Sequence, residues 1–302
     1  MTYTTRDGKA LVIGISGDSG SGKDTLSRGV AALFGDVNVV QVSGDDYHRA
    51  ERHDALWNET THLDPAANDL ARLATDVRAL AHGRSVSIRP YDHRTGRFGP
   101  DVLVAPRPVV VVNGLHTLYT PELREELDLC VHLDTEEELR RRLKRQRDVH
   151  KRNHTHEELT LLMSRREGDA VRYIRTQGAH ADLVIQLSAE RPADLSAEEL
   201  SSALPLVLDA HATGRWSSHV DAFAGCLGTW CRVLPGDQIR SDKASGLHVA
   251  GPLPTDLLTS AARSLHASRC AEVGHTRPAG VLGATALLVW HLALCALDDR
   301  TP

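Results

Sequence analysis

The loop Gly17-Asp18-Ser19-Gly20-Ser21-Gly22-Lys23-Asp24-Thr25 decides the fold of this chain, and it follows the apolar run Ala10-Leu11-Val12-Ile13-Gly14-Ile15. A glycine, four residues, a glycine and a lysine between a strand-like run and a helix-compatible segment form the pattern of a phosphate-binding loop. The glycines let several backbone N–H groups converge on one anion, while the positive end of the following helix and the Lys23 ammonium add charge there. Residues 17–25 are therefore predicted to bind a nucleoside triphosphate.

One position of this loop departs from the usual pattern. A hydroxyl residue normally follows the lysine and ligates Mg²⁺, and Asp24 stands in that place. Thr25 is a poor substitute, because one helical step turns its side chain about 100° away. Mg²⁺ accepts carboxylate oxygens, so Asp24 is the expected metal ligand. The alternative role of Asp24 is to cap the start of the helix.

Size and composition limit the classes of function. With 302 residues, the chain is long enough for one large α/β domain and a smaller appendage, or for two modest domains. A net charge of −5 gives no global attraction to nucleic acid or to an anionic membrane, so the expected partner is a small molecule. Five scattered cysteines without short metal-type spacing, and no signal peptide, predict reduced thiols in the cytoplasm.

Strand-like runs alternate with helical patterns in the first two thirds of the chain. The strand-like runs are residues 10–15, 38–42, 109–112, 129–133 and 183–187. Helical patterns cover residues 23–33, 70–81, 135–147 and 156–169, and the third begins with Thr135 and Glu138 as a capping box. This alternation predicts an α/β fold: a parallel sheet of the P-loop NTPase type with helices on both faces and with ligands at the carboxyl ends of its strands.

The C-terminal third carries no catalytic pattern. Strands are expected at residues 204–210, 230–234 and 247–250, and helices at 255–267 and 279–297. Residues 188–199 resemble a junction, so we expect a nucleotide-binding domain at 1–190 and a small α+β extension at 200–302. The apolar residues 281–297 are shorter than a bilayer span and contain His291, which predicts a buried or subunit-facing helix and not a membrane anchor. The extension is expected to mediate oligomerisation or to extend the sheet.

Two aspartates follow the second predicted strand, in the motif Gly44-Asp45-Asp46-Tyr47-His48. A carboxylate at the carboxyl end of a strand, beside the phosphate loop, is placed to accept a proton from an attacking hydroxyl and to bind Mg²⁺. Asp45 or Asp46 is therefore the candidate base. Turn or cap chemistry is the alternative for paired aspartates after a strand.

A basic segment lies further along the chain. It comprises Arg140-Arg141-Arg142-Leu143-Lys144-Arg145-Gln146-Arg147-Asp148 and His150-Lys151-Arg152. Phosphoryl transfer spreads negative charge over the equatorial oxygens, so cations that close over the nucleotide stabilise the transition state. The segment is predicted to be a mobile basic lid, with Arg140, Arg141 and Lys151 on its solvated face. The histidines at 150, 154 and 156 lack a carboxylate or cysteine at metal-site spacing.

Together these motifs resemble the phosphoribulokinase and uridine kinase family over residues 9–188. The likeness is greater to phosphoribulokinase, particularly its plant-like and archaeal forms, because Gly-Asp-Asp-Tyr-His at 44–48 is followed by five further segments in the same order. These segments are Leu63-Asp64-Pro65-Ala66-Ala67-Asn68, Tyr91-Asp92-His93-Arg94-Thr95-Gly96, Gly114-Leu115-His116-Thr117-Leu118-Tyr119, Lys144-Arg145-Gln146-Arg147-Asp148 with Arg152, and Ala181-Asp182.

The resemblance implies roles for individual residues. Asp45 would deprotonate the acceptor hydroxyl. Arg52 would hold a sugar-phosphate substrate, because a guanidinium binds a phosphate in a bidentate manner. The cations around the transferring phosphoryl group would be Lys23, Lys144 and Arg147, with Asp148 orienting the lid. The acceptor pocket would be lined by Tyr47, His48, Tyr91, His93, His116 and Arg152.

Two departures from the family pattern concern the metal. The predicted strand at 109–112 leads to Asn113, where the family normally has a glutamate, and Asp24 replaces the loop hydroxyl. We predict that these changes are linked, with the carboxylate moved from the strand end to the loop so that the site keeps its charge. The alternative is that Asp24 only caps the helix and that Asn113 marks an enzyme of weakened activity. A plant-type redox switch is not expected, because no cysteine precedes Cys130.

The activity that this resemblance implies is that of a kinase dependent on ATP and Mg²⁺. It would transfer the γ-phosphate to a hydroxyl of a sugar phosphate, with D-ribulose 5-phosphate as the first candidate. One alternative is a uridine-kinase-like or specialised-metabolite kinase acting on a nucleoside or sugar. A second is a catalytically silent nucleotide-binding regulatory protein. We expect a cytoplasmic homo-oligomer, a dimer first, that binds neither nucleic acid nor membrane.

Overall fold

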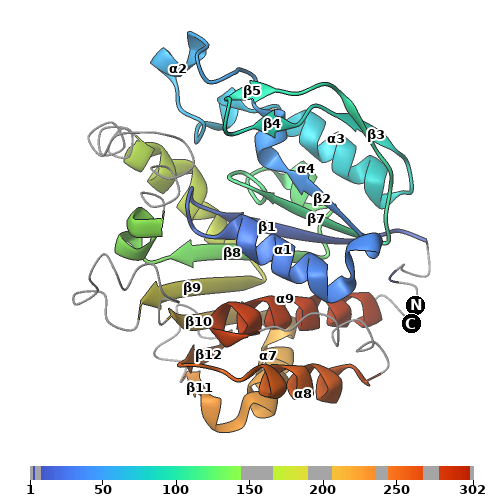
Figure 1. The fold of residues 1–302 in the computed structure, drawn as a ribbon, viewed down its shortest axis with the longest axis vertical. Coiled ribbons are helices and arrows are strands. Elements are labelled where there is room, and N and C mark those ends of the chain that lie inside the picture. Colours follow the sequence, from blue (N-terminus) through green and yellow to red (C-terminus); the bar gives the residue numbers. More distant parts are fainter. Residues whose placement is uncertain are drawn as a thin grey trace.

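An eight-stranded sheet forms the centre of the molecule, in the strand order β11-β12-β10-β9-β8-β1-β7-β2 (Figure 1). The computed structural model describes residues 3, 8–143, 166–189, 206–234, 244–267 and 279–299. Within these residues, helices cover both faces of the sheet. The predicted α/β fold of the P-loop NTPase type is confirmed.

Five neighbouring strands are parallel and coincide with the five predicted runs. They are β1 (Leu11–Gly17), β2 (Val39–Ser43), β7 (Val109–Gly114), β8 (Leu129–Thr135) and β9 (Leu183–Ala189). All seven residues of β1 are buried, as expected for a central strand with helices on both sides. The register pairs Ser43 with Asn113 and Ser16 with Gly114, so the carboxyl ends of β2, β7 and β1 meet at one edge.

Three antiparallel strands continue the same sheet beyond β9. They are β10 (Leu206–Thr213), β12 (Ala244–Ala250) and β11 (Cys231–Leu234), and β11 forms the outer edge. β10 pairs with β9 from Leu206↔Ala189 to Ala212↔Leu183. The C-terminal residues therefore extend the sheet, which is one of the two roles predicted for them. The predicted junction falls mostly outside the described residues, and the division into two domains stays a prediction.

In the described part of the chain, the helices on one face of the sheet are α1 (Lys23–Phe34), α7 (Ser217–Leu227), α8 (Thr255–Leu265) and α9 (Gly280–Asp299). Alternate residues of β1, namely Leu11, Ile13 and Ile15, join these helices in one large apolar core. This core crosses from the parallel to the antiparallel strands, so both parts of the sheet share a single hydrophobic layer.

The other face carries α3 (Leu70–Ala81) and α4 (Pro121–Arg124), which pack on Val12, Val110 and Val112. α3 has the predicted bounds, and the Asp69 side chain caps it by accepting a hydrogen bond from the N–H of Arg72 at 3.2 Å. Short elements lie near α3 (Figure 1). They are α2 (Leu56–Glu59), the β3 (Val86–Ile88) and β6 (Val102–Val104) pair, and the β4 (Tyr91–Asp92) and β5 (Arg97–Phe98) pair.

Helix α9 confirms the prediction of a buried helix for residues 281–297. It is long and apolar enough to cross a membrane by composition, but it packs inside the core, against α1 and the sheet on one side and against α7 and α8 on the other (Figure 1). Its ring contact between Trp290 and Phe34 of α1 joins the two parts of the chain, with centroids 6.4 Å apart. α9 is therefore a core helix of this fold.

The predicted capping box at Thr135 and Glu138 is wrong. Thr135 is the last residue of β8, and its hydroxyl donates to the Ser21 carbonyl oxygen at 2.8 Å instead of capping a helix. The Glu138 carboxylate pairs with Arg142 at 2.8 Å. Residues 137–143 are helical, within the predicted 135–147, and residues 144–165 lie outside the described part of the chain.

Candidate active site

The phosphate-binding loop spans the carboxyl end of β1 and the first turn of α1. Gly17, Gly20 and Gly22 have φ angles of 152°, 86° and 98°, which residues with a side chain rarely adopt. A Cβ on Gly17 would also lie 2.4 Å from the carbonyl oxygen of Leu133. The glycines are therefore needed for the conformation of the loop, and α1 begins at Lys23 as the sequence predicts.

Side chains hold three carbonyl oxygens of this loop. Lys23 is 9% exposed, and its ammonium donates to the Asp18 carbonyl oxygen at 2.8 Å. Thr135 donates to the Ser21 oxygen at 2.8 Å, and Arg140 donates to the Ser19 oxygen at 2.9 Å. These contacts fix the orientation of the peptide planes, which an anion-binding loop requires.

The prediction that Arg140 lies on a solvated helix face is wrong. Arg140 is 5% exposed and binds Ser19 as described, and its guanidinium forms a salt bridge with Glu137 at 2.7 Å. It also lies 3.5 Å from the buried carboxylate of Asp18. Arg140 contacts the loop because the helix after β8 begins beside it. Arg141, by contrast, is half-exposed, as predicted.

Sequence reasoning missed Arg175, which joins the same network. Its guanidinium lies 3.8 Å from Asp18, 3.4 Å from Glu137 and 2.7 Å from Glu167. A small hollow opens here between the loop and the helical segment near residue 170, lined by Asp18, Ser19, Leu63, Arg140, Arg166, Glu167 and Ala170. The basic segment contained a signal for Arg140, but no motif singled out Arg175.

Asp45 lies directly after β2, in the 3-10 helix η2 (Gly44–Tyr47). Its two carboxylate oxygens face two histidines, with His93 Nε2 2.9 Å from Oδ2 and His48 Nε2 3.6 Å from Oδ1. Burial opposes ionisation of Asp45, but the hydrogen bond from His93 and the charges of His48, His93 and Lys23 outweigh it and hold the pKa of this carboxyl below its ordinary value. Asp45 is therefore ionised at neutral pH and lies within the field of the loop lysine.

Asp46 occupies a different environment from Asp45. The N–H of Tyr91 donates to its Oδ1 at 2.7 Å, which ties η2 to the β4–β5 hairpin. Burial raises the pKa of Asp46 to about 6, and the neighbouring Asp45 charge adds to the rise. Asp46 thus stabilises the position of the β4–β5 hairpin, whereas Asp45 faces the two histidines.

A cluster of rings surrounds His48. Its Nδ1 lies 2.7 Å from Asn68 Oδ1, which fixes the ring. The rings of Trp57, His62 and Tyr91 pack around it, with centroid distances of 6.1, 4.5 and 5.2 Å. Burial lowers the pKa of His62 to about 2, so this histidine is neutral. The cluster forms a wall of flat, polar-edged rings beside Asp45.

Arg52 is joined to the loop between β4 and β5. Its guanidinium donates to the backbone oxygens of His93 and Arg94. The backbone N–H of Arg52 donates to the Gly96 carbonyl oxygen at 2.8 Å. Gly96 has a φ of 73°, and a Cβ there would meet the Arg52 side chain. Arg52 thereby holds the hairpin that carries His93 to Asp45.

Two predicted pocket residues, Tyr47 and His116, are buried. The Tyr47 ring packs in the core under α3, and its hydroxyl donates to Asp76 at 3.0 Å. His116 is buried, and its Nε2 lies 2.8 Å from the Leu63 carbonyl oxygen. Burial lowers the pKa of His116 to about 4, which leaves it neutral. Both residues support the walls of the site, and their contact with the substrate stays a prediction.

Asp24 and Asn113, the two departures from the family pattern, lie side by side. The Asn113 amide donates to Asp24 Oδ1 at 3.4 Å, from the end of β7 to the first turn of α1. Carboxylate and amide oxygens are both ligands of the kind that Mg²⁺ prefers. Lys144, Arg147, Asp148 and Arg152 fall outside the described residues.

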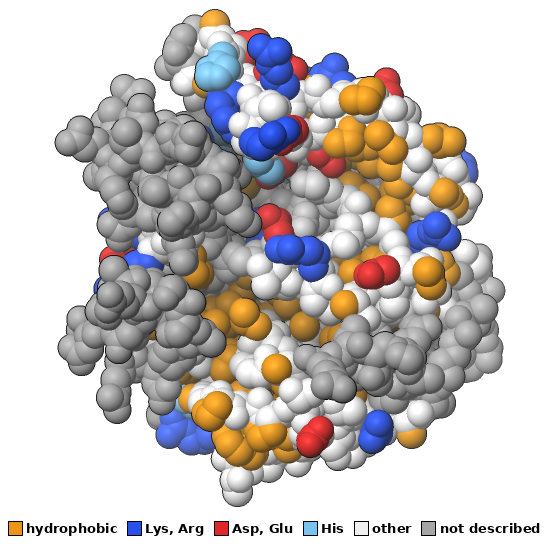
Figure 2. All heavy atoms as spheres, viewed as in Figure 1, with side chains coloured by type: hydrophobic (Ala, Val, Ile, Leu, Met, Phe, Trp, Pro, Cys, Tyr) orange, Lys and Arg blue, Asp and Glu red, His pale blue; other side chains and the backbone are white. Residues whose placement is uncertain are grey.

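Charged and histidine side chains gather at one end of the visible face, over α2, β4 and β5 (Figure 2). Hydrophobic side chains are more prominent over the rest of that face. This distribution matches the position of Asp45, His93 and Arg52 at the carboxyl edge of the parallel strands.

Comparison with known proteins gives the same family that the sequence motifs indicate. Residues 12–192 match the profile of the Phosphoribulokinase / Uridine kinase family. A phosphoribulokinase of Synechocystis sp. is 38% identical over 188 residues, which are 62% of this chain and 57% of that protein. A chloroplastic phosphoribulokinase of Spinacia oleracea is 33% identical over 196 residues, covering 59% of this chain and 49% of that protein. The chain thus spans about half the length of the curated relatives it matches.

A solved structure resembles the whole chain. The phosphoribulokinase from Rhodobacter spheroides superposes with a TM-score of 0.65 over 97% of this chain and 99% of its own, at 17% sequence identity. At that identity the likeness shows the fold, and it includes the antiparallel part of the sheet. The family profile covers more than half of the sequence, including the loop, Asp45 and the basic segment. The chain therefore belongs to the phosphoribulokinase and uridine kinase family.

Proposed function

We propose that this protein is an ATP-dependent kinase that transfers the γ-phosphate to a hydroxyl group of a sugar phosphate, with D-ribulose 5-phosphate as the first candidate. The observation that carries the proposal is Asp45, an ionised carboxylate at the end of β2 that lies within the field of Lys23 and is held by His93. Membership of the family and identities above 30% to phosphoribulokinases support the choice of acceptor.

The site geometry suggests how the residues share the reaction. His93 engages Oδ2 of Asp45, so Oδ1, which is 3.6 Å from His48, is the oxygen available to accept the proton of the acceptor hydroxyl. The hydroxyl oxygen forms the new bond to the γ-phosphorus as the bond to the ADP oxygen breaks. Because phosphoryl transfer has a loose transition state, a weakly basic but well-positioned carboxylate suffices.

Cations would stabilise the charge that develops during transfer. Lys23 lies at the phosphate loop, and the implied lid residues Lys144 and Arg147 would complete the set. Mg²⁺ would be held by Asp24 and Asp45 and would neutralise charge on the phosphates. The oxygen donors of Asp24 and of the adjacent Asn113 suit this ion.

The acceptor is proposed to lie between the β4–β5 hairpin and the ring cluster. His48, Tyr91 and His93 would contact its hydroxyl groups, while Arg52 and Arg152 would bind its phosphate. Arg52 lies beside the hairpin, which supports its role in positioning as well as in binding. The expected homodimer and the cytoplasmic location also stay predictions.

An ADP-release assay across ribulose 5-phosphate, other pentose phosphates, uridine and cytidine tests the proposal. We expect a phosphorylated pentose to give the highest kcat/KM. A clear preference for uridine or cytidine would replace the proposal with a uridine-kinase-like activity. One observation, Asn113 in place of a glutamate, favours a second candidate, a silent nucleotide-binding regulator. ATP binding by calorimetry without ADP release on any acceptor would support that candidate.

A further inference from the structure

A group of histidine and cysteine side chains lies in the helical layer of the antiparallel part, outside the residues of the active site. His219 belongs to α7, His291 and Cys295 to α9, and His266 follows α8. Histidines are unusual in such a setting, because most residues of α9 are buried and apolar. The polar atoms at this helix junction therefore need an explanation.

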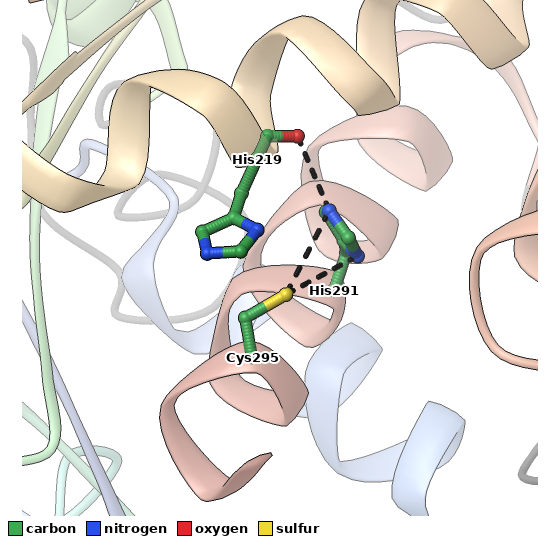
Figure 3. Close-up of side chains that lie close together, drawn as sticks. All are labelled: His219, His291 and Cys295. Carbon is green, nitrogen blue, oxygen red and sulfur yellow. Dashed lines mark hydrogen bonds between the residues drawn. The ribbon is translucent and has the colours of Figure 1, made fainter. Parts of the chain in front are cut away.

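The possible ligand atoms of three of these residues converge. One ring nitrogen each from His219 and His291 and the Sγ of Cys295 all lie within 4.8 Å of one another. The Cys295 sulfur is 3.8 Å from Nδ1 and 3.9 Å from Nε2 of His291. Figure 3 shows the His219 ring and the Cys295 sulfur gathered on the same side of His291.

Helix geometry explains the convergence. His291 and Cys295 are four residues apart, so they project from the same face of α9, one turn after the other. α7 packs across that face and contributes His219, and its Phe223 ring stacks on His291 at 6.3 Å with an angle of 21°. The pair on α9 is thus set by local structure, whereas His219 arrives through tertiary packing.

The orientation of His291 is fixed by the His266 ring and by the backbone of His219. Its Nδ1 lies 2.8 Å from His266 Nε2, and its Nε2 lies 3.2 Å from the His219 carbonyl oxygen. Histidines that ligate metals usually have such a partner on the other ring nitrogen, which holds the ring in place. Burial lowers the pKa of His291 to about 4, helped by the nearby His266, so the imidazole is in its neutral form.

We propose that His219, His291 and Cys295 bind one Zn²⁺ ion that links α7 to α9. Two imidazoles and a thiolate are ligands that Zn²⁺ favours over oxygen-seeking cations. Bond lengths of about 2.0–2.1 Å to nitrogen and 2.3 Å to sulfur imply a sulfur–nitrogen separation of roughly 3.6 Å in a tetrahedral site. The observed 3.9 Å between the Cys295 sulfur and Nε2 of His291 is close to this value.

Binding requires small local changes. The Cys295 thiol releases its proton to solvent as the sulfur binds the metal. When Nε2 of His291 is the ligand, Nδ1–H donates to His266, and the contact with the His219 carbonyl is replaced. The fourth position of the tetrahedron is left for water or for another nearby ligand. The ion would stabilise the packing of the C-terminal helices and would take no part in phosphoryl transfer.

Titration of the full-length, metal-free protein with Co²⁺ tests this site, with Mg²⁺ in excess to occupy sites that prefer oxygen. We expect one Co²⁺ per chain, a near-ultraviolet thiolate-to-cobalt absorption band, and displacement of Co²⁺ by Zn²⁺. C295S should remove the band and weaken binding at least tenfold. C226S, which changes a cysteine of α7 outside the group of three, is the matched control. It should keep the absorption band and the wild-type affinity for Co²⁺.

Two further measurements keep the test decisive. H219A should also weaken Co²⁺ binding, and Zn²⁺ should raise the melting temperature of the wild type and of C226S but not of C295S. Circular dichroism of the metal-free variants confirms that each one folds. Wild-type protein without the thiolate band, or C295S and H219A with unchanged affinity and spectrum, would overturn the proposal.

Discussion

The parallel and antiparallel parts of the sheet use their polar side chains in opposite ways. In the parallel part, β1, β2 and β7 end at one edge, where the phosphate loop, Asp45 and Asn113 meet. In the antiparallel part, His219, His291 and Cys295 lie within the helical layer. Parallel strands gather all their carboxyl ends at one edge, whereas antiparallel neighbours alternate in direction. Strand direction therefore concentrates chemistry in one part and leaves the other to packing.

The largest expected effect comes from removing the antiparallel part. Truncation after Glu199 deletes β10, which pairs with β9, and α9, which covers α1. An unpaired strand edge and an exposed apolar helix face favour aggregation. We expect the truncated protein to be insoluble or to aggregate, as measured by size-exclusion chromatography. A soluble truncated protein with full activity would show that the parallel part is independent.

A pair of tryptophan variants tests how much the shared core contributes to the stability of the full-length chain. Trp290 of α9 is fully buried against Phe34, whereas Trp230 is 37% exposed. Trp290→Ala should lower the free energy of unfolding by about 3–5 kcal/mol through the cavity it leaves. Trp230→Ala should cost far less in the same urea titration. Equal losses would contradict a core that joins the two parts.

Within the parallel part, Lys23→Ala and Asp45→Asn should each lower kcat by roughly 10³-fold, which is about 4 kcal/mol of transition-state stabilisation. Lys23 supplies charge at the phosphate loop, and Asp45 supplies the proton acceptor. Asp36→Asn, an exposed aspartate that precedes β2, is the matched control and should leave kcat unchanged. Near-normal turnover of Asp45→Asn would transfer the assignment of the base to Asp46.

Sequence could predict the parallel part because its signals are local. Five apolar runs gave the five parallel strands, and the glycines of the loop specified its unusual backbone angles. Asp45 could be singled out because it directly follows a strand that ends at the ligand-binding edge. The predicted link between Asp24 and Asn113 came from comparing the sequence with the family pattern, and the structure brings the two side chains into contact.

Features that depend on packing between distant segments could not be predicted. Arg140 belongs to a basic run that resembles a solvated face, and only the position of the loop buries it. Tyr47 follows the candidate base in sequence, but its ring is directed under α3. His291 and Cys295 are four residues apart, a spacing that the sequence analysis did not single out, and His219 comes from another helix and has no local pattern.

Arg52 can be used to ask whether the β4–β5 hairpin binds substrate or only supports the site. Arg52→Ala should raise KM for the phosphorylated acceptor by about 10–100-fold, because a bidentate contact with a phosphate is lost, and should leave KM for ATP near its normal value. Arg49→Ala, an exposed neighbour that pairs with Asp69, is the control. Arg52→Lys keeps the charge and should rescue only part of the loss. Equal changes in both KM values would identify Arg52 as a structural clamp of the hairpin.

The smallest effects concern Asp24 and Asn113, and a double-mutant cycle tests whether they exchanged roles. Their contact of 3.4 Å places the loop carboxylate and the strand-end amide at one site, so Asp24→Ser with Asn113→Glu would return the carboxylate to the strand at constant charge. Each single change alters the charge next to the phosphates by one unit, and we expect about a tenfold loss of kcat/KM for each. The double variant should recover to within a few fold of the wild type, because contacting residues couple by about 0.5–3 kcal/mol. The Mg²⁺ concentration needed for ATP binding should differ from the wild-type value in each single variant. It should return to the wild-type value in the double variant. Additive losses in both measurements would mean that Asp24 only caps α1 and that Asn113 marks a weakened metal site.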